Sequence, residues 1–177
     1  MFDILNHMKL IILNGSSCSG KSSVIKNIMM EKDGLFHLSY DRIKWSFSKY
    51  DRNKYYKDVR EIIFAVAESV FKMGHNVISD STLYRDTKIK LIDLAFKYKY
   101  QVIEINLEAS YEVLLSRFNE RIADSKIHPE RKISNLSKDR FKELFDIFNN
   151  EKDPSAITFN TDKQTVEEVT KEISKLI

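Results

Sequence analysis

The sequence predicts an α/β fold in which a five-stranded parallel sheet is sandwiched by helices. Two observations predict this fold. Five short apolar runs alternate with segments of helical period, and the first run leads into a glycine-rich turn. The chain has 177 residues, of which 42% are hydrophobic, which suits the core of one domain better than two. We therefore expect residues 1–177 to form a single domain.

The five predicted strands are short and apolar, as expected for strands that are buried on both faces of a parallel sheet. The first strand, KLIILN, is ended by Gly15, and the third, NVIS, runs directly into Asp80. The strands are expected over residues 9–14, 35–39, 76–79, 101–107 and 156–160. Because a helical segment separates each strand from the next, we expect consecutive strands to be parallel.

The predicted helices carry apolar residues three and four positions apart. Val59, Ile63, Val66 and Val70 keep this spacing up to Gly74, which stands where a helix C-terminal cap belongs. The other helices are expected over residues 21–31, 86–98, 111–122, 137–149 and 166–176.

Two segments fall outside this alternation. Residues 1–7 can be an N-terminal extension, because Met8 and Lys9 lead directly into the first strand. Residues 124–136 are polar and basic, contain Pro129 and lack apolar periodicity. We predict that this second segment is a mobile loop.

Composition excludes several classes of protein. The 29 basic and 26 acidic residues give a net charge of only +3, which disfavours a dedicated duplex-binding protein. The one cysteine, Cys18, excludes an internal disulfide framework and suits a reducing compartment. No apolar run approaches the roughly 18–20 residues that span a bilayer, and the N-terminus lacks a signal-peptide pattern. We expect a cytoplasmic protein without membrane contact. The sequence does not determine its oligomeric state.

The glycine-rich turn after the first strand matches the phosphate-binding pattern G-x-x-x-x-G-K-[ST] and precedes a helix. Glycines let successive backbone N–H groups face a phosphate, and the helix N-terminus adds the positive end of its dipole. Lys21 would reach the β- and γ-phosphates of ATP, and the Ser22 hydroxyl would coordinate Mg²⁺. The predicted ATP-binding residues are Gly15, Ser16, Ser17, Cys18, Ser19, Gly20, Lys21, Ser22 and Ser23.

With this motif, the chain resembles the small P-loop kinases grouped with polynucleotide 5′-kinase, chloramphenicol phosphotransferase and the zeta toxins. The segment IILNGSSCSGKS looks most like the chloramphenicol phosphotransferase version, and residues 39–121 look more like the polynucleotide kinase version. The resemblance covers most of residues 8–177 in the order of elements, but only the P-loop is highly specific. It implies a P-loop NTPase fold of the nucleoside-kinase type, a lid over 124–136, and transfer of the γ-phosphoryl group of ATP to a hydroxyl.

In that family the general base is an acidic residue just after the second strand, and Asp41 stands at this position. A carboxylate at the C-terminal end of a strand would lie beside the P-loop and could take the proton of the acceptor hydroxyl. The polynucleotide kinase pattern has a substrate-binding arginine three residues later. Here Lys44 occupies that place and Arg42 directly follows Asp41. We predict all three at the substrate, with an N-cap as the alternative role of Asp41.

Asp80 ends the third strand and begins a segment that resembles D-[TS]-[NT] of the family. The resemblance implies that Asp80 and Ser81 bind or orient the acceptor, or that Asp80 contacts Mg²⁺ through water. Capping and turn formation are the alternative roles of this segment. As the catalytic base, Asp80 ranks below Asp41.

Arg117 and Arg121 are spaced i, i+4 and therefore share one helix face. They resemble the paired arginines that begin the lid of the family and neutralise phosphate charge during transfer. The alternative is a solvated helix face on which both arginines form ordinary ion pairs with Glu120.

The acceptor is open at this stage. A small molecule is preferred, because the chain is short and mildly basic and lacks the Asp-x-x-Arg spacing. The nearest rival is a 5′-hydroxyl of RNA or DNA, because the aromatic and basic residues between Trp45 and Lys57 could stack a base. A less favoured class is a regulatory ATPase module that signals to a partner, since no N/T-K-x-D motif occurs and Asp80 is not followed by a second acid.

Overall fold

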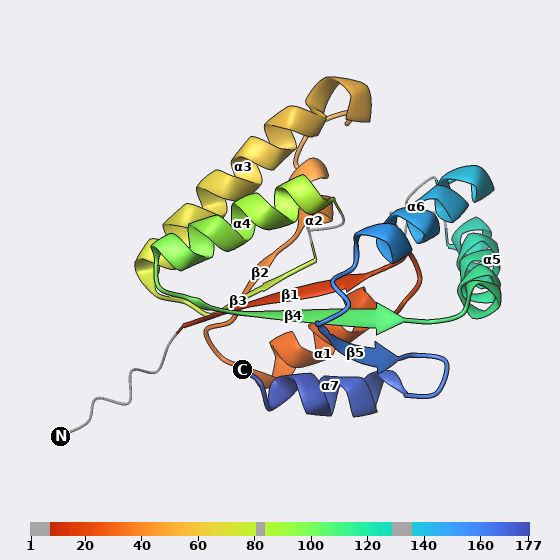
Figure 1. Ribbon diagram of the computed structural model, residues 1–177. Helices are drawn as coiled ribbons and strands as arrows, with labels where there is room; N and C mark the ends of the chain where they lie inside the picture. Colours follow the sequence, from red (N-terminus) through yellow and green to blue (C-terminus); the bar gives the residue numbers. More distant parts are fainter. Residues whose placement is uncertain (1–7, 81–83, 129–135) are drawn as a thin grey trace.

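A five-stranded sheet forms the centre of the computed structural model, which describes residues 8–80, 84–128 and 136–177 (Figure 1). All strand pairs are parallel, and their order is β2-β3-β1-β4-β5. The strands are β1 (Lys9–Gly15), β2 (Phe36–Leu38), β3 (Val77–Ser79), β4 (Gln101–Glu108) and β5 (Ile157–Asn160). The predicted five-stranded parallel sheet is confirmed.

The central strand β1 pairs with β3 on one side and with β4 on the other. Ile12 lies opposite Ser79 of β3, and Gly15 lies opposite Leu107 of β4. The carboxyl ends of these three strands therefore meet at one edge of the sheet, which is where ligands bind in open parallel sheets.

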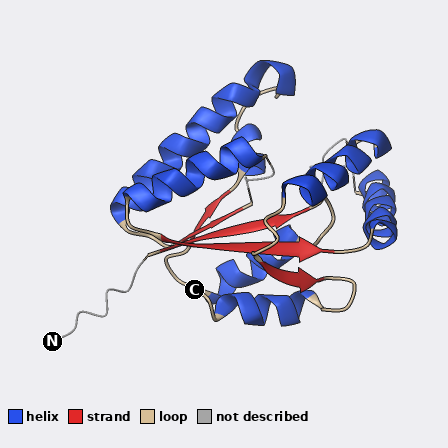
Figure 2. Cartoon of the chain, in the orientation of Figure 1, coloured by secondary structure: helices blue, strands red, loops and turns tan. Residues whose placement is uncertain are grey.

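Helices cover both faces of the sheet, as Figures 1 and 2 show. The helices are α1 (Lys21–Glu31), α2 (Tyr40–Lys44), α3 (Arg52–Met73), α4 (Arg85–Lys97), α5 (Tyr111–Ile127), α6 (Lys138–Glu151) and α7 (Val166–Ser174). α3 and α4 lie against one face, α1 and α7 against the other, and α5 and α6 stand at the carboxyl end of the strands. Gly74 caps α3 in the left-handed region, as predicted.

Alternating residues of β1 face opposite cores because successive strand side chains point to opposite sides. Leu10 and Ile12 pack against α3 and α4, whereas Ile11 and Leu13 pack against α1 and α7. All four side chains are buried. The apolar run of β1 therefore joins the two layers of helices to one sheet.

A third and smaller core holds α5 and α6 together. The Phe118 and Phe141 rings stack with their centroids 4.5 Å apart, and Leu114 completes the buried cluster. Cys18 of the P-loop packs against it. This cluster fixes the position of both helices beside the P-loop.

The predicted loop over 124–136 is wrong at its start, because residues 124–127 form the last turn of α5. The N–H of His128 donates to the carbonyl oxygen of Asp124 at 2.9 Å. Polar residues do not stop a helix, whereas a proline restricts the residue before it, and α5 ends next to Pro129. The rest of this predicted loop, like the predicted extension 1–7, lies largely outside the described residues. Within the described ranges, no helix has the length and apolar character needed to cross a bilayer.

Candidate active site

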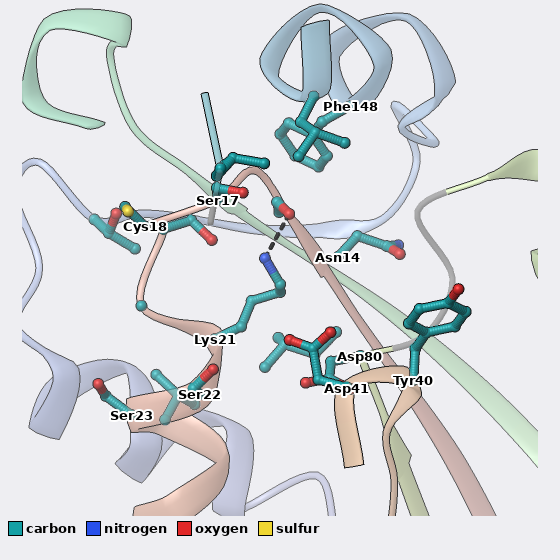
Figure 3. A pocket seen from close by; sticks show the side chains of 18 of the residues that line it. Asn14, Ser17, Cys18, Lys21, Ser22, Ser23, Tyr40, Asp41, Asp80 and Phe148 are labelled. Carbon is teal, nitrogen blue, oxygen red and sulfur yellow. Dashed lines mark hydrogen bonds between the residues drawn. The ribbon is translucent and has the colours of Figure 1, made fainter. Parts of the chain in front are cut away.

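A cavity of about 750 Å³ opens at the carboxyl edge of the sheet (Figure 3). The P-loop forms one wall, and side chains from α2, α3, α5, α6 and α7 and from the start of α4 line the rest of the cavity. Of the nine predicted ATP-binding residues, eight line the cavity. The exception is Ser16, which is buried beneath the loop and contributes its carbonyl oxygen to Lys21.

The backbone of the P-loop requires glycine at its first position. A Cβ atom at Gly15 would lie 2.8 Å from the carbonyl oxygen of Leu107 and 2.4 Å from the Ser19 hydroxyl. Gly20 and Cys18 both have positive φ angles, of 95° and 67°, in the left-handed region. The loop is thus folded tightly against β4 before α1 begins.

The Lys21 side chain turns back into the loop. Its ammonium donates hydrogen bonds to the carbonyl oxygens of Gly15 at 2.6 Å and of Ser16 at 2.8 Å. Burial lowers the pKa of Lys21 below its ordinary value, although the charges of Asp80 and Asp41 oppose this shift. The charge is therefore costly to bury and is held beside two carboxylates, at the place where a phosphate would accept its hydrogen bonds.

The N-terminus of α1 is open to an anion. Gly20 occupies the N-cap position without a side-chain hydrogen bond, and no acidic residue stands in the first turn. Side chains cap α3, α5, α6 and α7, the residues being Asp51, Ser110, Ser137 and Thr165. The first N–H groups of α1 are thus left for a ligand, with the positive end of the dipole behind them.

Asp80 lies at the carboxyl end of β3 and points toward Lys21 (Figure 3). Its Oδ1 is 3.4 Å from Nε2 of His37, whose side chain is buried on β2. Burial alone would raise the pKa of Asp80, but the neighbouring His37, Lys21 and Ser39 lower it below its ordinary value. Asp80 is therefore an anion in the cavity wall. Its predicted neighbour Ser81 lies outside the described residues.

Asp41 lines the cavity beside Asp80, but not as a helix cap. The N-cap position of α2 belongs to Ser39, and Asp41 stands in the first turn of this helix. The Asp41 carboxylate pairs with the ammonium of Lys44 at 2.7 Å and is largely exposed. Both residues line the cavity.

Arg42 does not line the cavity that Asp41 and Lys44 line, and its contact with a substrate stays a prediction. Residues i and i+3 share a helix face, whereas adjacent residues point about 100° apart. Arg42 is exposed, and its carbonyl oxygen accepts a hydrogen bond from Ser46.

Arg117 and Arg121 both line the cavity from α5. Arg117 donates to the Thr161 carbonyl oxygen at 2.6 Å and to the Cys18 carbonyl oxygen at 3.4 Å. It therefore ties the P-loop to the segment after β5. Among the described residues, no ion pair joins Glu120 to Arg117 or Arg121, and Glu120 accepts a hydrogen bond from Ser116. The charge of Arg121 lowers the pKa of Lys21, after the larger effect of burial.

Several cavity residues were not singled out from the sequence as site residues. Tyr84, Arg140 and Thr161 all line the cavity, and Thr161 follows β5. One signal was available for Thr161, because residues after the carboxyl end of a parallel strand lie at the ligand edge. Tyr84 and Arg140 had no such signal, since only the tertiary fold brings them to the cavity.

A family model described as an AAA domain (AAA_33) matches residues 10–144, which is most of the chain. The chain belongs to this family. It is a P-loop kinase family, and the resemblance stated from the motifs is confirmed. The match includes the P-loop, Asp41, Asp80 and both arginines of α5.

Solved structures share the kinase-like P-loop fold. A provisionally assigned kinase from Chloroflexus aurantiacus J-10-fl has a TM-score of 0.70 at 18% identity, with 97% of each chain covered. The APS kinase CysC of Mycobacterium tuberculosis, in complex with AMPPNP and APS, has a TM-score of 0.62 at 16% identity, covering 96% of this chain and 97% of that chain. The Pnkp1/Rnl/Hen1 RNA repair complex matches with a TM-score of 0.63 at 18% identity, covering 84% of this chain and 47% of that chain.

Proposed function

We propose that this member of the P-loop kinase family is an ATP-dependent phosphotransferase that moves the γ-phosphoryl group onto a hydroxyl of a small molecule. One observation carries the proposal: Lys21 in the P-loop faces Asp41 and Asp80 within one cavity (Figure 3). A cation that holds the transferred phosphate and a carboxylate that takes a proton are the two groups that such a transfer needs.

The P-loop would hold the phosphates of ATP. Backbone N–H groups of the loop and of the first turn of α1 would donate to phosphate oxygens, and Lys21 would exchange its two carbonyl partners for them. The change costs little, because the ammonium keeps its number of hydrogen bonds and gains an opposite charge.

Mg²⁺ fits the residues at this edge. Ser22 at the start of α1 and Asp80 offer oxygen donors, which Mg²⁺ prefers. Within the described ranges, Asp80 Oδ1 is buried and faces His37 Nε2 at 3.4 Å without a well-formed hydrogen bond. The described part of the chain contains no group of three or more His, Cys, Asp and Glu side chains placed for a metal. Two protein oxygens with phosphates and water suit an ion that arrives with ATP and neutralises phosphate charge.

Asp41 would act on the acceptor. Its carboxylate is exposed to the cavity, and the Lys44 ammonium holds it from one side. It would orient the hydroxyl and take its proton as the phosphoryl group transfers. Arg117 and Arg121, which line the cavity from α5, would stabilise the charge that develops on the transferred group.

A polynucleotide 5′-hydroxyl is the second candidate acceptor, and one observation favours it. Tyr40, Tyr56 and Tyr84 form a row along the cavity wall, with ring centroids 6.0 and 6.2 Å apart. Such rings can stack a base. The small acceptor is still preferred, because the whole cavity is only about 750 Å³ and the phosphates of ATP would fill part of it.

The test is transfer of labelled phosphate from ATP to panels of hydroxyl metabolites and 5′-hydroxyl oligonucleotides. We expect a small hydroxyl compound to accept the label, with little change in its KM between about 50 and 200 mM salt. Lys21→Ala should abolish the transfer. Labelling of oligonucleotides alone, with a steep salt dependence, would establish the second candidate and contradict the first.

A further inference from the structure

Two arginines from different helices converge on one neutral oxygen in the cavity wall. Arg52, the first residue of α3, and Arg140, near the start of α6, each donate a hydrogen bond to the Tyr84 hydroxyl at 2.7 Å. All three side chains line the cavity. Two like charges held at one phenol oxygen repel each other, and a neutral partner does not offset this repulsion.

The arginines in this wall differ in whether a carboxylate neutralises their charge. Arg140 forms an ion pair with Glu143 on its own helix, and neighbouring Arg60 pairs with Asp86 at 2.7 Å. Arg52 stacks over the rings of Tyr56 and Tyr84, with its guanidinium carbon 5.1 and 5.8 Å from their centroids. Among the described residues, no carboxylate lies within ion-pair distance of Arg52. This guanidinium therefore has a charge and unused donors to offer a ligand.

The arginines lie on the acceptor side of the cavity. Figure 3 shows Asp41 and Asp80 between Lys21 and the Tyr40 ring. From Tyr40, the row of rings continues through Tyr56 to Tyr84, where Arg52 and Arg140 meet. The cavity thus has one set of cations at the P-loop and another at the far end of the row of rings. The Asp41 and Asp80 carboxylates lie between Lys21 and the start of that row.

We propose that Arg52 and Arg140 bind an anionic group of the acceptor, so that the substrate is a small hydroxyl compound that also carries a carboxylate or a phosphate. This inference rests on the proposed function, because it assumes that the acceptor binds in the part of the cavity that extends from Asp41 and Asp80 toward the tyrosine rings. Guanidinium forks match the planar or tetrahedral oxyanions and bind them through paired hydrogen bonds. The anion would replace the Tyr84 hydroxyl as the common partner of both arginines, and the acceptor hydroxyl would extend along the rings toward Asp41.

The experiment uses inorganic phosphate as the probe on protein saturated with Mg²⁺ and AMPPNP, so that the P-loop is occupied. Calorimetric titration should show saturable phosphate binding by the wild-type chain. Arg52→Gln and Arg140→Gln should each weaken it about tenfold or more, as loss of a charge-assisted hydrogen bond does. Lys72→Gln is the matched control, because Lys72 is an exposed cation of α3 outside the cavity. Acetate, titrated in the same way, tells whether a carboxylate or a phosphate binds better.

Tyr84→Phe separates binding from a structural role. This variant removes the oxygen that both arginines now share, so it should bind phosphate at least as tightly as wild type. If the three residues only brace the cavity wall, Tyr84→Phe should weaken phosphate binding as the arginine variants do, and that result would overturn the inference.

The remaining outcomes are also decisive. Absence of saturable phosphate binding, or equal affinity in Arg52→Gln and Lys72→Gln, would overturn the anion site. Displacement of phosphate by a 5′-hydroxyl oligonucleotide, with a steep loss of affinity at higher salt, would overturn the small acceptor. Failure of the wild-type chain to bind AMPPNP would instead contradict the proposed function, and the comparison of Arg52→Gln with Lys72→Gln would still report on the arginines.

Discussion

Gly15→Ala tests whether the tight fold of the P-loop determines nucleotide binding. The added Cβ atom would stand 2.8 Å from the Leu107 carbonyl oxygen and 2.4 Å from the Ser19 hydroxyl, both too close for contact. Ser19 is buried and Leu107 is part of β4, so the loop itself must move. Overpacking of this kind costs about 1–3 kcal/mol, which lowers the Tm of a chain of this size by about 2–12 °C.

The displaced loop should also bind ATP poorly. Its N–H groups and Lys21 would no longer converge on the phosphates, and a misplacement of about 1 Å can cost a factor of roughly 100. Gly74→Ala is the control, because Gly74 has a φ of 74° but nothing lies within 4 Å of an added Cβ. It should lose some stability through backbone strain and keep its ATP affinity, both measured by calorimetry. Equal ATP affinity in Gly15→Ala and Gly74→Ala would refute the reasoning.

Three further predictions concern the carboxylates, the small core and an ion pair. Asp41→Asn should lower kcat by roughly 10²–10⁴-fold with near-normal ATP affinity, whereas Asp80→Asn should mainly raise KM for Mg²⁺ or acceptor; steady-state kinetics showing the reverse pattern would exchange their roles. Phe141→Ala should destabilise the chain by about 3–5 kcal/mol in urea unfolding, because its ring is fully buried, whereas exposed Phe96→Ala should change little. Asp86 pairs with Arg60 at 2.7 Å. Burial would raise the pKa of Asp86, but Arg60 and the Thr87 N–H lower it below its ordinary value of 3.8. The ion pair therefore stabilises the fold above pH 3.8, and this stabilisation is lost as the pH falls through the lowered pKa of Asp86. Asp86→Asn should therefore cost less than about 1 kcal/mol at pH 7 and nothing in strong acid; an equal loss at both pH values would contradict the assignment.

Much of the fold was predictable because its signals are local. Each strand is an apolar run bounded by polar or turn residues, and the P-loop is a fixed pattern of eight residues between a strand and a helix. The end of α5 was predictable as well, since Pro129 marks it. The loop was instead predicted to begin at residue 124, because the segment from there on is polar.

The cavity wall formed by Arg52, Tyr84 and Arg140 was not predictable, because its contacts join distant parts of the chain. Tyr84 lies 32 residues from Arg52 and 56 residues from Arg140 along the sequence. No spacing or composition signal links these positions, and only the packing of α3, α4 and α6 around the sheet brings them together. The same holds for Arg117 and Thr161, which are 44 residues apart. The position of His37 beside Asp80 likewise depends on the pairing of β2 with β3.

The nucleotide affinity of Lys21→Ala tests the central claim most directly. Calorimetric titration with Mg²⁺ and ATP should give one binding site in the wild-type chain and in Lys26→Ala, an exposed lysine of α1 that lies outside the cavity. Lys21→Ala should bind at least tenfold more weakly, because it loses the cation that meets the phosphates. If Lys21→Ala binds ATP as tightly as Lys26→Ala, the P-loop is not the nucleotide site and the account is contradicted.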